Sequence, residues 1–190
     1  MGKTNQTLSE YLVEFSSGPV RLHLGCGGVR WKDFTNIDYY PHLENQSDSS
    51  RNGCIADCYA DIRKLGLDDC SVDEIFTSHT FEHFTKWDGI ELLNDWFRML
   101  RKGGKLVIEM PDFWRCVFWL FHPLKRKRAL GRSQFYGNQW DKLEFETHRY
   151  LWSMREFTST LHEVGFTTIN ASHRTETHYP WRDMRVEAIK

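Results

Sequence analysis

The chain has 190 residues, of which 40% are hydrophobic and 27% are charged, and this suits one domain with an ordinary core. Its formal net charge of -1 gives no overall argument for nucleic acid or an anionic membrane surface as the main partner. The five cysteines have no paired CxxC spacing, which argues against a disulfide framework and a zinc ribbon. Without an apolar leader or a long apolar run, we expect a cytoplasmic protein with no membrane insertion, folded as a single domain over residues 1–190.

The sequence predicts one helix and then short strands separated by turns in the first third of the chain. An amphipathic helix is expected over Thr7 to Phe15, and a strand over Val20 to Leu24 runs into a turn that carries three glycines in four positions, Gly25, Gly27 and Gly28. The next strand, Thr35 to Asp38, follows after too few residues for a crossover helix. Further elements expected here are an exposed loop over Pro41 to Gly53 and a strand over Cys54 to Tyr59.

The rest of the chain alternates strands and helices around one irregular segment. Residues 111–148 show no clean period, and we interpret them as a substrate-side insertion at the carboxyl edge of a sheet. The regular elements expected are strands over Ser71 to Thr77 and Lys105 to Met110, a helix over Trp87 to Arg101 that Lys102, Gly103 and Gly104 stop, a helix from Ser153 to Val164 that Gly165 caps, and closing strands over Phe166 to Ser172 and Met184 to Ile189. This order predicts an α/β protein with a Rossmann-like, doubly wound sheet of about seven strands, mostly parallel with an antiparallel closing strand.

Three features favour a ligand that contains adenosine. Glycines in the turn after the first strand let the backbone approach a ligand closely. Asp38, at the end of the second strand, is placed to accept both hydroxyls of a ribose. Asp61, after the third strand, is placed to accept a hydrogen bond from the exocyclic amine of adenine, although such a residue is as often a helix N-cap.

Five ordered motifs carry a family resemblance: Leu22 to Gly27, Asn36 to Asp38, Ala60 to Ile62, His79 to Phe84, and Leu100 to Leu106. Together they resemble the motif series of the class I S-adenosylmethionine-dependent methyltransferases, most closely the short methyltransferase-like proteins often associated with polysaccharide biosynthesis. The resemblance implies S-adenosyl-L-methionine as the cofactor. The residues that it places at the cofactor are Leu24, Gly25, Cys26, Gly27, Asp38, Tyr39, Asp61, Ile62, Ser78 and His79.

Methyl transfer to a hydroxyl requires alignment and removal of a proton. We predict His79, Glu82 and His148 as the catalytic residues, with either histidine as the general base. If residues 79–83 are helical, His79, Glu82 and His83 share one face. Small-RNA 2'-O-methyltransferases and ubiquinone-pathway O-methyltransferases carry a similar segment that binds a divalent ion. A metal at His79, Glu82, His83 and His148 is therefore an alternative, which we do not favour.

The basic run from Lys125 to Arg132 is either a solvated face or a site for phosphate. We expect O-methylation of a small-molecule or saccharide acceptor. One alternative is a nucleic-acid methyltransferase that acts on the ribose 2'-oxygen. Another is a non-catalytic S-adenosylmethionine-binding module that serves as a partner or sensor. The sequence predicts no oligomeric state.

Overall fold

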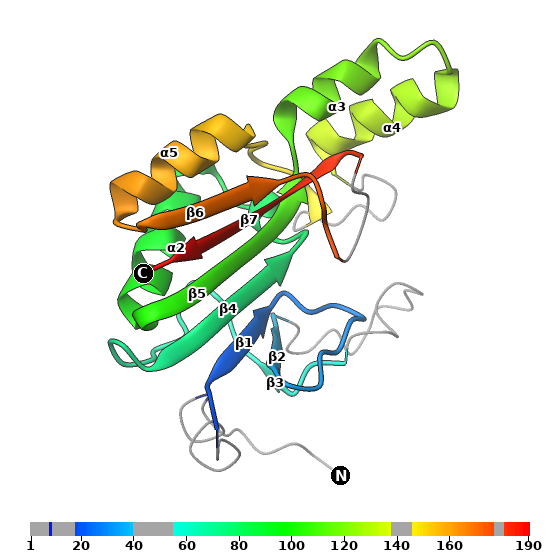
Figure 1. Cartoon of the computed structure of the whole chain (residues 1–190). Coiled ribbons are helices and arrows are strands. Elements are labelled where there is room, and N and C mark those ends of the chain that lie inside the picture. Colours follow the sequence, from blue (N-terminus) through cyan, green and yellow to red (C-terminus); the bar gives the residue numbers. More distant parts are fainter. Residues whose placement is uncertain (1–7, 9–17, 40–54, 138–145, 177–180) are drawn as a thin grey trace.

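A seven-stranded sheet forms the centre of the molecule in the computed structural model, which describes residues 8, 18–39, 55–137, 146–176 and 181–190 (Figure 1). Its strands are β1 (Arg21–Leu24), β2 (Thr35–Asp38), β3 (Cys58–Tyr59), β4 (Val72–Ser78), β5 (Leu100–Pro111), β6 (Thr168–Ser172) and β7 (Asp183–Ile189). Apart from Leu8, the helix expected over Thr7 to Phe15 lies outside the described residues. The whole loop expected over Pro41 to Gly53 also lies outside the described residues.

The strand order is β3-β2-β1-β4-β5-β7-β6, and the pairs from β3 to β5 are parallel. Strand β7 runs antiparallel to both β5 and β6 and lies between them. The predicted fold class is confirmed. Because β7 is reversed, its first residue, Asp183, pairs with Pro111 at the end of β5. The beginning of β7 therefore lies at the edge where the parallel strands end.

One face of the sheet packs against α2 (Lys86–Met99) and α5 (Met154–Val164), which contact each other. Leu22, Ile75 and Ile108 belong to the core cluster that this face and the two helices share. The prediction that Lys102, Gly103 and Gly104 stop a helix ending at Arg101 is wrong. Helix α2 ends at Met99, and Leu100 already pairs with Val72 as the first residue of β5.

The opposite face is covered by the short connection between β1 and β2. The ring of Trp31 stacks on that of Phe76 with 4.2 Å between centroids. Asn36 is fully buried in β2, where its side chain accepts from the Trp31 amide at 2.9 Å and donates to the carbonyls of Trp31 and Phe34, both at 3.0 Å. These bonds satisfy the backbone of a connection that has no helix to do so.

The predicted third strand is shorter than expected, since only Cys58 and Tyr59 pair with β2. Before it, the Ile55 amide donates to the Gly27 carbonyl and the Asp57 amide to the Asn36 carbonyl. These residues brace the glycine turn and β2 without continuing the strand.

Residues 111–148 contain a helical hairpin of α3 (Phe113–Leu120) and α4 (Lys125–Tyr136), which projects beyond the carboxyl ends of the parallel strands (Figure 1). The interpretation of this segment as a substrate-side insertion stays a prediction, and its two helices were not predicted. Helix α3 is apolar at nearly every position and α4 is mostly polar, so neither shows a two-sided pattern. Within the described part of the chain, no helix is long and apolar enough to cross a membrane.

Candidate active site

The glycine turn closes the carboxyl end of β1 against β2. Gly25 and Gly27 have φ angles of 68° and 49°, and the amides of Gly25 and Cys26 both donate to the Ile37 carbonyl, at 2.9 and 3.1 Å. A Cβ on Gly25 would collide with the side chain of Thr80, which leans over the turn from the end of β4. A Cβ on Gly27 would meet no atom within 4 Å. The turn is therefore packed at Gly25 and borders open space at Gly27.

Asp38 is fixed beside this open space. Its Oδ2 accepts from the Gly27 amide at 2.7 Å, and its Oδ1 accepts from the Tyr39 amide at 2.7 Å. The carboxylate is nearly buried, and each oxygen keeps a further lone pair. Among the described residues, the Asp38 carboxylate thus lies beside a glycine turn that leaves room at Gly27, which fits a ligand with hydroxyl donors such as a ribose.

The structure gives less direct evidence on the other residues that were predicted to bind the cofactor. Asp61 is bound by Arg63, with Nη2 2.7 Å from Oδ2 and Nε 2.9 Å from Oδ1, and this pairing outweighs desolvation and lowers the pKa of Asp61. Contact between Asp61 and adenine stays a prediction. The side chains of Leu24, Cys26 and Ile62 are buried, so at these positions it is the backbone that can face a ligand. The Ser78 carbonyl accepts from the Thr80 hydroxyl at 3.2 Å.

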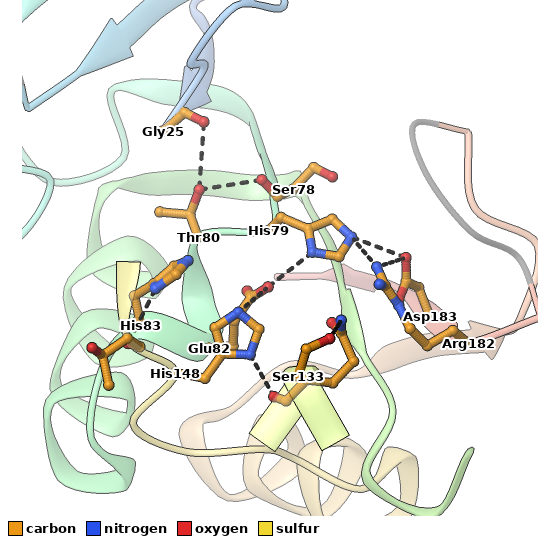
Figure 2. A network of polar contacts seen from close by, with 12 residues as sticks. Gly25, Ser78, His79, Thr80, Glu82, His83, Ser133, His148, Arg182 and Asp183 are labelled. Carbon is orange, nitrogen blue, oxygen red and sulfur yellow. Dashed lines mark hydrogen bonds and ion pairs between the residues drawn. The ribbon is translucent and has the colours of Figure 1, made fainter. Parts of the chain in front are cut away.

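His79 is held between two carboxylates at the same edge of the sheet. Its Nδ1 lies 2.9 Å from Glu82 Oε1, and its Nε2 lies 2.9 Å from Asp183 Oδ2. Arg182 donates to the Asp183 carboxylate, so the row of contacts runs from Arg182 through Asp183 and His79 to Glu82 (Figure 2). Two cations and two anions alternate along it.

This arrangement sets the charge of His79. Burial alone would lower its pKa, but Glu82 and Asp183 outweigh burial and raise the pKa to about 9. His79 is therefore an imidazolium at neutral pH, with both nitrogens donating. Both ring nitrogens of His79 face carboxylates, which does not favour the predicted role of His79 as a general base, and its catalytic role stays a prediction. The pKa of Glu82 falls to about 2 because His79 outweighs the effect of burial.

The expectation of a helix over residues 79–83 also needs correction. The 3-10 helix η1 (Phe81–His83) begins two residues later, and His79 has a left-handed φ of 51°. His79 and Glu82 do meet, but across a turn. His83 points elsewhere, with its Nδ1 3.2 Å from the Thr147 carbonyl.

A second cluster joins Glu82, His83 and His148. One side-chain donor atom from each of these residues lies within 4.8 Å of the others. The Nδ1 of His148 is 2.6 Å from the Gln134 carbonyl, and the Nδ1 of His83 faces the Thr147 carbonyl. A carbonyl only accepts, so the Nδ1 of each ring donates. Burial lowers the pKa of His148, so its neutral ring presents a lone pair at Nε2.

Glu82 adds a third acceptor to this cluster. Its Oε1 lies 3.9 Å from the His148 Nε2, and its buried Oε2 has no hydrogen-bond partner among the described residues. Glu82 Oε2 and His148 Nε2 are thus two acceptor atoms that belong to the same cluster. The cluster is suited to receive a proton donor such as a hydroxyl, or a cation.

The predicted site residues did not include Asp183, Arg182, Thr80 and Gln134. A signal for Asp183 was present, because an acidic residue at the beginning of an antiparallel strand falls at the edge where parallel strands end. Thr80 and Gln134 act through packing and a backbone carbonyl, which the sequence pattern does not reveal.

A twisted, mostly parallel sheet with a glycine turn and an acidic strand end defines a Rossmann-like nucleotide-binding protein. The family model described as "Methyltransferase domain" matches residues 13–108. Comparison with curated protein sequences finds no match. The chain belongs to this methyltransferase domain family, and it is an S-adenosylmethionine-dependent methyltransferase.

Solved structures of methyltransferases share the fold at low sequence identity. A methyltransferase from Methanosarcina mazei is 16% identical with a TM-score of 0.58, covering 97% of this chain and 98% of the other. One from Archaeoglobus fulgidus is 15% identical with a TM-score of 0.58, covering 96% and 91%. A phosphoethanolamine N-methyltransferase from Haemonchus contortus, in complex with S-adenosylhomocysteine, is 12% identical with a TM-score of 0.54, covering 98% and 53%.

Proposed function

We propose that this methyltransferase acts on a hydroxyl oxygen of a small-molecule or saccharide acceptor. The observation that carries the proposal is the lone pair of His148 Nε2, fixed 3.9 Å from the Glu82 carboxylate. Bound S-adenosylmethionine supplies a methyl group on a positively charged sulfur. The protein must therefore align the acceptor and accept its proton.

His148 meets the requirements of a general base. Its burial lowers the pKa, which outweighs the opposing effect of Glu82, so the ring is neutral at pH 7. The bond from Nδ1 to the Gln134 carbonyl fixes the tautomer and directs the Nε2 lone pair toward the cluster. The imidazolium formed on proton transfer gains an ion pair with Glu82.

His79 supports this role without touching the acceptor. Its charge keeps Glu82 ionised, and its bond to Glu82 Oε1 orients the carboxylate. Asp183 and Arg182 hold the other side of the His79 ring. Loss of His79 would therefore weaken proton transfer through Glu82.

The same donor set suits a divalent transition-metal ion bound by two imidazoles and one carboxylate. Elemental analysis of the purified protein, together with activity before and after treatment with a chelator, separates the two forms of the mechanism. If activity needs a stoichiometric metal, the metal aligns the acceptor, and this role replaces the proposed general base. Metal-free protein with full activity supports His148 as the base.

The direct test is methyl transfer from labelled S-adenosylmethionine to a panel of monosaccharides, nucleotide sugars and short RNA and DNA strands. We expect methyl ethers on a saccharide or small molecule, and a fall in kcat of about 10²–10⁴ for His148→Gln with unchanged binding of S-adenosylhomocysteine. His162→Gln, an exposed histidine on α5, is the matched control and should keep wild-type kcat. Products methylated on nitrogen, ribose methylation of RNA as the sole activity, or full activity of His148→Gln would each overturn the proposal.

A further inference from the structure

The α3–α4 hairpin exposes a row of large apolar side chains. Trp114, Phe118 and Phe121 follow one another at helical spacing, with exposed fractions of 65%, 71% and 80%. Leu124, in the turn, is also exposed. Single exposed apolar side chains are common on protein surfaces, but a row of them on one protruding element indicates a binding surface.

The hairpin is also the most basic part of the chain. Its sequence from Phe113 to Gly137 contains no acidic residue, and its basic residues are Arg115, Lys125, Arg126, Lys127, Arg128 and Arg132. In the described part of the chain, no carboxylate pairs with Lys125 or Arg126. The whole protein carries a net charge of -1, so this cationic surface is local and is set against an otherwise acidic chain.

The turn between α3 and α4 brings exposed apolar side chains and basic side chains together. Arg128 Nη1 donates to the carbonyls of His122 and Pro123 at 2.9 and 2.8 Å, which closes the turn. Phe121 and Leu124 are both exposed at this turn, and Leu124 directly precedes Lys125 and Arg126 in the sequence. The tip points away from the sheet (Figure 1).

We propose that the α3–α4 hairpin docks the protein on the surface of an anionic lipid bilayer. Aromatic rings suit the boundary between head groups and acyl chains, while the basic side chains face anionic head groups. Nucleic acid explains the basic residues but not the exposure of Leu124, which offers no π-face for stacking. The inference goes beyond the proposed function and does not depend on the acceptor.

Docking would bring the active-site cluster close to the bilayer. The carbonyl of Gln134, near the end of α4, holds the Nδ1 of His148. Helix α3 also lines a cavity of about 1000 Å³ along its length, and the walls include Trp114, Phe118, Trp119, Arg155 and Trp181. Neither the glycine turn nor Glu82 borders this cavity, so it belongs to the hairpin face.

The test is sedimentation of the full chain with vesicles of phosphatidylcholine alone or mixed with phosphatidylglycerol. We expect binding to the mixed vesicles that weakens steeply with salt. Phe118→Ser with Phe121→Ser should weaken binding about tenfold or more, because two large apolar side chains no longer enter the boundary of the bilayer. Lys125→Glu with Arg126→Glu should also weaken binding about tenfold or more, because each basic residue contributes about fivefold. All four side chains lie on the surface, and circular dichroism verifies that the variants fold.

Two matched controls lie away from the hairpin. Trp87→Ser removes an aromatic side chain of α2 that is 72% exposed, and Lys102→Glu reverses an exposed charge at the beginning of β5. Both should bind like the wild type. Equal binding of hairpin and control variants, or no binding of the wild type to mixed vesicles, would overturn the proposal. The proposal would also be overturned if the protein did not bind vesicles but formed a dimer, or a complex with a single-stranded oligonucleotide, that the hairpin substitutions abolish.

Discussion

The Nε2 of His79 lies 2.9 Å from the carboxylate of Asp183, which is 104 residues further along the chain. Strand β7 creates this contact by running antiparallel beside β5, so that it begins where β4 and β5 end. Glu82 binds the other nitrogen of the same ring at 2.9 Å. The contact between His79 and Asp183 shows how the closing strand β7 contributes to a site whose other parts follow the parallel strands.

The first prediction concerns pH and stability. Folding raises the pKa of His79 from 6.5 to about 9, so the folded state binds a proton that the unfolded chain releases. The resulting stabilisation, on the order of 3 kcal/mol, is fully present below pH 6.5 and is lost as the pH rises through 9. Denaturant unfolding between these pH values should show the loss. In Asp183→Asn the pH dependence should be smaller, and an unchanged slope in that variant would contradict the assignment.

The second prediction concerns the glycine turn. Gly25→Ala should lower the free energy of unfolding by at least about 2 kcal/mol, because the backbone is left-handed and the new Cβ collides with Thr80. Gly18→Ala is the control, since a Cβ there meets nothing within 4 Å. It should change stability by no more than about 1 kcal/mol. Equal effects of the two substitutions would show that Thr80 does not pack over the turn.

The third prediction concerns Asn36. Asn36→Ala removes the bonds that satisfy the backbone of Trp31 and Phe34, and should cost about 2–4 kcal/mol of stability. The exposed Asn94, with one bond from its side chain to the Ile90 carbonyl, is the matched control. Its substitution by alanine should cost about 0.5 kcal/mol or less. Thermal unfolding of the two variants measures the difference, and a stable Asn36→Ala protein would mean that the short connection closes by ring packing alone.

Much of the fold could be predicted from the sequence. Apolar runs such as Lys105 to Met110 and the capped helix from Ser153 to Gly165 carry local signals, and both elements are present. The boundary at Met99 was missed because Leu100 to Gly104 reads as a helix end, whereas pairing with β4 makes it the beginning of a strand. Tertiary pairing overrode a local pattern there.

The site was predictable only in part. Gly25, Gly27 and Asp38 follow from motif spacing, and the structure brings them together. The charge of His79 depends on Asp183, and the tautomer of His148 depends on the Gln134 carbonyl, so neither could be derived from spacing. These contacts are the reason why we propose His148 rather than His79 as the general base.

Titration calorimetry with S-adenosylhomocysteine tests the central claim most directly, on the wild type, Asp38→Ala and the exposed control Asp33→Ala. We expect one site per chain, with affinity weakened by roughly 1.5–3 kcal/mol in Asp38→Ala and unchanged in Asp33→Ala. The Asp38 carboxylate is the acceptor fixed beside the glycine turn, which is the physical reason for the loss. Absence of binding to the wild type, or equal affinity of all three proteins, would contradict the account.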